Sequence, residues 1–355
     1  IYILLVGGIS VSSGHIHFTP THTYMAFRLQ ARTLTATSMK RLLNRVSALL
    51  RSIGAMPSNI RRNLEAITSS RYSAYRRLRS SFAPDYLKTR HLTSYQTPLW
   101  DSFNAQAEQC LLPFPGWNFL RNTVLRQTML IQKRGNLLLS QLEFIIQHWG
   151  APQAHALLPD PAFGAAPIDN VPYTTSHNTI HHASHLAQWE HHTGKSLSNI
   201  STIVEWGGGY GNLARLCSHL NPKSTHIIID TPLFAQLQWL YLSVTLPNRT
   251  VTRITNPEQS IKSGHITIIP VGLIDSMGIP QADLFISTWA LSESSRTAQD
   301  FVAQSNWFGA RHLLIGYQER NEQLPDSDYL GVLAQRDGAT ILPIAQLKRQ
   351  FYAFR

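Results

Sequence analysis

A glycine-rich turn between a predicted strand and a predicted helix is the clearest candidate for a ligand site. A β-branched run over residues 202–206 predicts the strand, and apolar residues at helical spacing over Leu213–Leu220 predict the helix. Four glycines stand in the turn: Gly207, Gly208, Gly209 and Gly211. Because glycine has no Cβ, the chain can turn tightly there and a ligand can approach the backbone. The free N–H groups at the start of the helix would complete a binding site.

The residues around these glycines indicate which ligand fits. The spacing differs from the dinucleotide-binding pattern G-x-G-x-x-G, because Asn212 stands where that pattern has its last glycine or alanine. No Lys-Ser or Lys-Thr pair follows, as a phosphate-binding loop would require. Glu205, two residues before Gly207, would repel a pyrophosphate but suits an ammonium or sulfonium group. The ligand that matches this chemistry is S-adenosylmethionine.

A second carboxylate ends the next predicted strand, His226–Asp230. Adjacent parallel strands would bring Asp230 beside the glycine turn, where a carboxylate can accept hydrogen bonds from both hydroxyls of a ribose. The alternative is that Asp230 caps the following helix, since Asp-Thr-Pro is a favourable helix opening. We favour the ligand role because the acidic residue follows the correct strand in the order.

Four stretches of the chain together resemble the sugar O-methyltransferases, a family within the class I S-adenosylmethionine-dependent methyltransferases. They are residues 182–195 with the glycine turn 205–212, residues 230–243, residues 283–293 and residues 315–318. The resemblance therefore covers about residues 181–318. The first 150 residues show no motif that we can assign to the family.

The resemblance implies a set of contacts to S-adenosylmethionine. The residues that it assigns to the cofactor are Glu205, Gly207, Gly208, Gly209, Gly211, Asp230 for the ribose, Thr231 beside it, Ser287 and Thr288. It also implies that the end of the fourth strand, with Trp289, lies below the cofactor and faces the acceptor. Two departures are Thr231 in place of a leucine and Ser287 in place of an asparagine. The second departure weakens the expectation that an amide there orients the substrate.

Methyl transfer to a hydroxyl requires alignment of the acceptor and a base that removes its proton. Glu293 lies one helical turn beyond the fourth strand, at the edge of the sheet where ligands of open α/β folds bind. It is the first candidate for the base, and His185 is the second.

Histidines gather just before the first strand of the predicted sheet. They are His177, His181, His182, His185, His191 and His192. His177, His181 and His185 follow i, i+4 spacing and would share one face of a helix, as metal ligands can. No acidic residue joins that face, and the neighbouring Leu186 and Trp189 favour ordinary packing. We therefore predict no metal site, and a catalytic or substrate-binding histidine and a polar helix surface stay open as alternatives.

Strands and helices alternate over residues 177–355, which predicts a doubly wound, Rossmann-like α/β methyltransferase sheet. The predicted strands are 202–206, 226–230, 266–271, 284–288, 312–317, 340–343 and 350–354, with helices at 213–220 and 233–246. No internal repeat at solenoid periods is present.

The preceding residues, 25–150, form a basic and mostly helical N-terminal region in this interpretation. Apolar residues recur at helical spacing over residues 38–50 and in two helices within residues 99–150, and residues 59–82 also favour a helix. Gly150 with Pro152 ends the last helix. Five prolines over residues 151–176 predict a linker or a long surface loop. We expect the helical region to help cover the acceptor.

The net charge of +11 belongs to one segment of the chain. Residues 28–90 carry 14 basic and two acidic residues, so the rest of the chain is close to neutral. Such an arm could contact nucleic acid, an anionic membrane or a glycolipid. We favour a solvated lead-in because blocks of like charge are usually tails, and we expect no nucleic-acid partner.

The composition of the 355 residues limits the class of protein further. Two cysteines, Cys110 and Cys217, exclude a disulfide scaffold and indicate a reducing, cytoplasmic compartment. No apolar run approaches the length of a membrane span. The chain begins with Ile1, so residues 1–24 are an uncertain extension and Met25 is a plausible start.

These observations together predict an S-adenosylmethionine-dependent O-methyltransferase that acts on a sugar hydroxyl of a small molecule or glycan. Two alternatives stay open: a methyltransferase with another small acceptor, and a non-catalytic Rossmann-like module docked through the basic arm. The sequence predicts no oligomeric state.

Overall fold

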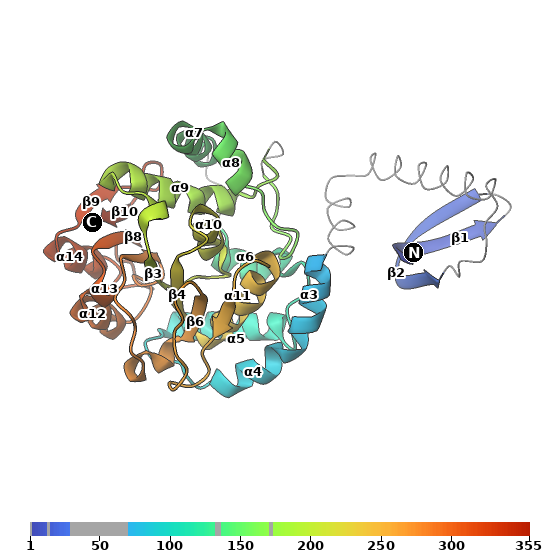
Figure 1. Ribbon diagram of the computed structural model, residues 1–355, viewed down its shortest axis with the longest axis horizontal. Coiled ribbons are helices and arrows are strands. Elements are labelled where there is room, and N and C mark those ends of the chain that lie inside the picture. The colour runs from blue at the N-terminus through green and yellow to red at the C-terminus, as the bar shows by residue number, and fades with distance from the viewer. Residues whose placement is uncertain (1, 13–14, 29–69, 132–135, 170–172) are drawn as a thin grey trace. The chain divides into compact units, whose positions relative to one another are not determined.

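The structure is a computed structural model that describes residues 2–12, 15–28, 70–131, 136–169 and 173–355, with the backbone alone for residues 2–28 (Figure 1). The chain divides into two units, residues 1–70 and residues 71–355. The amphipathic helix predicted over residues 38–50 and most of the basic arm lie outside the described residues.

The first unit contains an antiparallel pair of strands, β1 (Tyr2–Ser12) and β2 (His15–Arg28). Their register shifts between Val6 and Gly8. Met25 therefore lies within β2, and its role as a start stays a prediction.

The second unit begins with short helices, as the sequence predicts for this region. They are α3 (Ser70–Leu78), α4 (Phe82–Thr89), α5 (Pro98–Leu111), α6 (Thr123–Met129), α7 (Leu137–Trp149) and α8 (Ala151–Leu157). Gly150 ends α7 with a φ of 82°, a conformation that glycine adopts freely. α8 occupies the start of the segment predicted to be a linker or loop, because Pro152 stands in the first turn of the helix, where a missing N–H costs nothing.

The described residues then form a sheet of eight strands. From edge to edge these are β5 (Val251–Arg253), β6 (Ile266–Pro270), β4 (Thr225–Asp230), β3 (Thr202–Trp206), β7 (Leu284–Thr288), β8 (His312–Gln318), β10 (Gln350–Phe354) and β9 (Thr340–Pro343). The first six are parallel, and β10 pairs antiparallel with both β8 and β9. The predicted doubly wound α/β fold is confirmed, and the short edge strand β5 is an addition to it.

Helices cover both faces of this sheet (Figure 1). They are α9 (His177–Thr193), α10 (Asn212–Leu220), α11 (Pro232–Thr245), α12 (Arg296–Gln304), α13 (Asn306–Gly309) and α14 (Tyr329–Arg336). Successive residues of β3 face opposite sides: Ile203 packs in a core with residues of α9 and α10, and Val204 in a core with residues of α12 to α14. Within the described residues, no helix combines the length and apolar character needed to cross a membrane.

The strand order creates one place where the direction of winding reverses. From β3 the chain continues to β4 on one side, and after β6 it crosses to β7 on the other side of β3. The loops that follow β3 and β7 therefore leave the sheet in opposite directions. A crevice at the carboxyl ends of these two strands is where open α/β sheets bind ligands.

Candidate active site

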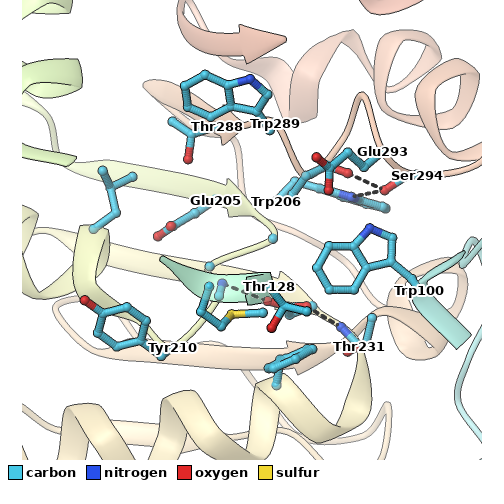
Figure 2. Close-up of a pocket in the computed structure, with 18 of the residues that line it drawn as sticks. Trp100, Thr128, Glu205, Trp206, Tyr210, Thr231, Thr288, Trp289, Glu293 and Ser294 are labelled. Atoms are coloured by element: carbon cyan, nitrogen blue, oxygen red, sulfur yellow. Dashed lines mark hydrogen bonds between the residues drawn. The ribbon is translucent and has the colours of Figure 1, made fainter. Parts of the chain in front are cut away.

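A cavity of about 310 Å³ lies at the carboxyl ends of β3, β4 and β7 (Figure 2). Its floor is the glycine turn after β3, and its sides include Asp230, Thr231, Thr288 and Trp289 from the ends of β4 and β7. Helical segments before the sheet add Trp100 and Thr128. The glycine turn and the two strand ends predicted from the sequence are therefore brought to one site.

The glycine turn leaves no room for a Cβ at two of its positions. Gly207 has a φ of 78°, and a Cβ there would lie 1.9 Å from the Cβ of Ala290. A Cβ on Gly208 would lie 2.7 Å from Ile228 Cγ2. Gly211, with a φ of 95°, is the N-cap of α10 and packs against Leu242 behind the turn, outside the cavity wall. Glycine is needed here by the backbone and its neighbours, which explains the motif.

Glu205 stands on β3 directly below the turn and lines the cavity. Its side chain is 2% exposed, and its Oε2 lies 2.8 Å from Nε2 of the fully buried His226 on β4. One side of the carboxylate is thus held by the neighbouring strand.

Asp230 ends β4 and is surrounded by donors. Its carboxylate accepts hydrogen bonds from the backbone N–H of Gly209 at 3.2 Å and of Thr231 at 2.7 Å, and from Gln238 Nε2 at 2.5 Å. The N-cap of α11 is Thr231, so Asp230 is not the cap of that helix. Burial raises the pKa of Asp230 to about 7, although the three donors oppose this shift.

Glu293 lies in the turn after β7, where its N–H donates to the carbonyl of Trp289 at 3.0 Å. Its Oε1 accepts a long bond of 3.5 Å from Gln318 Nε2, and the Trp100 side chain also hydrogen-bonds to the carboxylate. Burial raises the pKa of Glu293 to about 7, and these two donors only partly offset the rise. A carboxylate in this state can accept a proton near neutral pH.

Trp289 lines the cavity and also contacts the histidine-rich helix α9. Its backbone has a φ of 68°, which a bulky residue rarely adopts, and its N–H donates to the carbonyl of Gly316 at 2.7 Å. Its ring centroid lies 5.5 Å from that of His181 and 5.2 Å from that of His185. Strained backbone of this kind tends to gather at functional sites.

Besides Gly211, two residues that the sequence assigns to the site stand outside the cavity wall. Ser287 is fully buried, donates to the carbonyl of Trp206 at 3.1 Å and accepts from the N–H of Leu291 at 3.0 Å, so it joins the loops after β3 and β7. His185 is fully buried with its Nδ1 2.6 Å from the hydroxyl of Tyr352, and burial lowers its pKa well below the ordinary value. The position of His185 follows from packing, because α9 is buried on more than one side.

The wall also contains residues that sequence reasoning missed, chiefly Trp100, Thr128 and His182. Trp100 and Thr128 come from α5 and α6, where no motif marks them. His182 belongs to the histidine cluster, but i, i+4 spacing draws attention to the other face of the helix. In the structure its Nδ1 lies 3.2 Å from Nδ2 of Asn212, a contact that no sequence pattern marks.

The described residues contain no group of three or more histidine, cysteine, aspartate or glutamate side chains placed to hold a metal ion. His181 Nδ1 pairs with Gln141 Nε2 at 2.8 Å, and His185 pairs with Tyr352. The i, i+4 face of α9 is therefore engaged in packing and hydrogen bonds.

No protein-family model matches the chain, and no curated protein matches it. Among solved structures, the chain is similar to a SAM-dependent methyltransferase from Aquifex aeolicus, with 16% identity, a TM-score of 0.31, and coverage of 45% of this chain and 82% of that one. The chain is also similar to the mitomycin 7-O-methyltransferase MmcR, with 12% identity, a TM-score of 0.32, and coverage of 80% of this chain and 96% of that one. A third similar structure is an O-methyltransferase family protein from Burkholderia thailandensis, with 12% identity, a TM-score of 0.30, and coverage of 81% of this chain and 95% of that one. The fold stated above rests on the strand order of this chain.

Proposed function

We propose that the chain is an S-adenosylmethionine-dependent O-methyltransferase that acts on a sugar hydroxyl. The observation that carries this proposal is the charge of the cavity. Three carboxylates line it, those of Glu205, Asp230 and Glu293, and no lysine or arginine does so among the described residues. Such a cavity attracts a ligand with ammonium and sulfonium groups and disfavours a polyphosphate.

In this proposal the first two carboxylates bind the methyl donor. Glu205 accepts hydrogen bonds from the ammonium group, and Asp230 accepts them from the ribose hydroxyls. Asp230 is suited to this task because three donors already fix its orientation. The glycine turn, the Thr231 backbone and Thr288 complete the wall on this side.

Glu293 is the base in this proposal. The bound donor supplies an electrophilic methyl group and a sulfur that leaves with the electron pair of the broken carbon–sulfur bond. The acceptor oxygen forms the new bond to carbon, and Glu293 takes the hydroxyl proton. A base whose pKa is about 7 matches this step, which general-base catalysis accelerates by about 10²–10⁴-fold.

The groups around Glu293 favour a sugar as the acceptor. The wall there offers neutral amides, Gln96, Gln318 and Gln350, together with the indoles of Trp100 and Trp289. Amides can donate to and accept from hydroxyls, and aromatic faces pack against the apolar side of a sugar ring. Another small hydroxylated acceptor is the second candidate, and the neutral lining supports it as well.

Calorimetry with S-adenosylhomocysteine tests the donor, and transfer of labelled methyl groups to free and nucleotide-linked sugars tests the acceptor. We expect one binding site per chain and methylated sugar product. Glu258→Gln is a matched control, because Glu258 is an exposed carboxylate outside the cavity. Absence of binding would contradict the methyltransferase assignment, and transfer only to non-sugar hydroxyls would contradict the sugar.

We include a cytoplasmic location in the proposal, supported by the free thiols of Cys110 and Cys217. Contact of the basic arm with an anionic membrane or glycolipid stays a prediction.

A further inference from the structure

His182 lies on α9 and forms part of the cavity wall. Its Nδ1 stands 3.2 Å from Nδ2 of Asn212, and Nε2 forms no hydrogen bond with any described residue. A neutral imidazole donates from one nitrogen and accepts at the other, so the location of its proton decides what it offers to a ligand. The surrounding bonds determine that location.

Asp160 determines which atoms donate in the hydrogen bonds that lead through Thr179 to Asn212. Its carboxylate can only accept, and the hydroxyl of Thr179 donates to Asp160 Oδ1 at 2.7 Å. The proton of Thr179 is therefore committed, and its oxygen accepts from Asn212 Nδ2 at 3.1 Å. This places the amide nitrogen of Asn212 toward Thr179.

Arg215 determines independently which end of the Asn212 amide accepts a hydrogen bond. A guanidinium can only donate, and Arg215 Nε donates to Asn212 Oδ1 at 2.9 Å. The contacts with Thr179 and with Arg215 therefore require the same orientation of the Asn212 amide. In this orientation the second N–H of the amide is directed to His182 Nδ1. Nδ1 must accept, so the proton of the neutral ring is on Nε2.

Burial and the charge of Arg215 lower the pKa of His182 to about 4, so the ring is neutral at physiological pH. His182 therefore presents an uncharged N–H at the wall and cannot act as a base through Nε2. His182 is therefore a candidate for ligand recognition.

We propose that His182 donates its Nε2–H to the carboxylate in the methionine part of the cofactor. This inference rests on the proposed function. The cofactor carries one carboxylate that needs donors, and the described lining supplies no lysine or arginine for it. A neutral donor suits this position because it binds the carboxylate without repelling the nearby sulfonium and ammonium groups. Asn212 is then a positioning residue that fixes the tautomer, and Asp160 and Arg215 orient Asn212.

The test compares two ligands that differ only in this group: S-adenosylhomocysteine and its decarboxylated analogue, S-adenosyl-3-thiopropylamine. For the wild type, we expect calorimetry to show about 10- to 100-fold tighter binding of the ligand with the carboxylate. In His182→Phe this preference should be lost while affinity for the analogue changes by less than about twofold. His182→Gln should retain part of the preference, because its amide N–H reaches a similar position. His155→Phe, on an exposed part of α8, is the control.

The outcomes separate the two levels of the proposal. If the wild type binds neither ligand, the methyltransferase assignment is wrong. If it binds both and His182→Phe leaves the preference intact, or weakens both ligands equally, the role of His182 is refuted.

A second measurement does not depend on ligand binding by the variants. In the nitrogen NMR spectrum of the ¹⁵N-histidine-labelled wild type, His182 should show an unprotonated Nδ1 and a protonated Nε2 at pH 7. The resonance is assigned by its absence in His182→Gln. A protonated Nδ1 would overturn the inference.

Discussion

Asp230 and Glu293 stand at two sides of the same cavity, and burial raises the pKa of both to about 7. Their surroundings differ. Asp230 accepts three hydrogen bonds from the protein, two of them from backbone N–H groups, whereas Glu293 receives a 3.5 Å bond from Gln318 and one from Trp100. A carboxylate held by backbone donors is suited to binding, and one held by few side-chain donors is suited to exchange a proton.

The largest effect is expected for Glu293→Gln, which removes the base and keeps the shape of the side chain. The rate of methyl transfer should fall by about 10²–10⁴-fold, while the affinity for S-adenosylhomocysteine changes little. Single-turnover kinetics and calorimetry measure these quantities. A large loss of affinity with an unchanged rate would reverse the roles of the two carboxylates.

Asp230→Asn should mainly lower the affinity for the cofactor rather than the rate of methyl transfer. The amide cannot accept in the same way from both ribose hydroxyls, so the affinity for S-adenosylhomocysteine should fall by about 10- to 100-fold. The rate of methyl transfer at saturating donor should fall less than in Glu293→Gln. Calorimetry of Asp230→Asn beside Glu258→Gln tests this, and equal affinities in the two variants would contradict the binding role.

The pH dependence of binding sharpens the comparison. Ribose hydroxyls bind the ionised form of Asp230, so binding lowers the pKa of Asp230 from its value of about 7 in the free protein. Affinity should be full above pH 7 and fall below it, by about tenfold at pH 6. Glu293→Gln should keep this dependence and Asp230→Asn should lose it. Calorimetric titrations from pH 5.5 to 8.5 provide the measurement, and the opposite pattern would assign the dependence to Glu293.

The smallest effect is expected for Ser287→Ala. Ser287 joins the loops after β3 and β7 through two hydrogen bonds and does not line the cavity. Its loss should lower the free energy of unfolding by about 1–3 kcal/mol and leave cofactor affinity unchanged. Thermal unfolding with and without S-adenosylhomocysteine checks both; a selective loss of affinity would restore Ser287 to the binding site.

The sequence predicts the Asp230 side of the cavity better than the Glu293 side. The glycine turn and Asp230 follow from backbone requirements: a strand end, a positive φ at Gly207, and an acidic residue one strand further on. Such requirements appear directly as residue types and spacings. Trp100 reaches Glu293 from α5 through tertiary packing, which has no local pattern.

The same limit explains the two displaced site residues. Ser287 precedes the cavity residue Thr288 by one position, and its side chain is on the opposite side of the strand. His185 lies on a face of α9 that is buried by Tyr352 and Trp289, more than 100 residues further along the chain. Periodicity identifies a helix face but cannot say what it packs against. Pro152 likewise predicts a break but stands in the first turn of α8, because its effect depends on its position in the helix.

Calorimetric titration of the wild-type protein with S-adenosylhomocysteine at pH 7.5 is the decisive test of the methyltransferase assignment. We expect one site per chain, with binding strongly weakened in Asp230→Asn and retained in Glu293→Gln. Absence of measurable binding by the folded wild-type protein would contradict it.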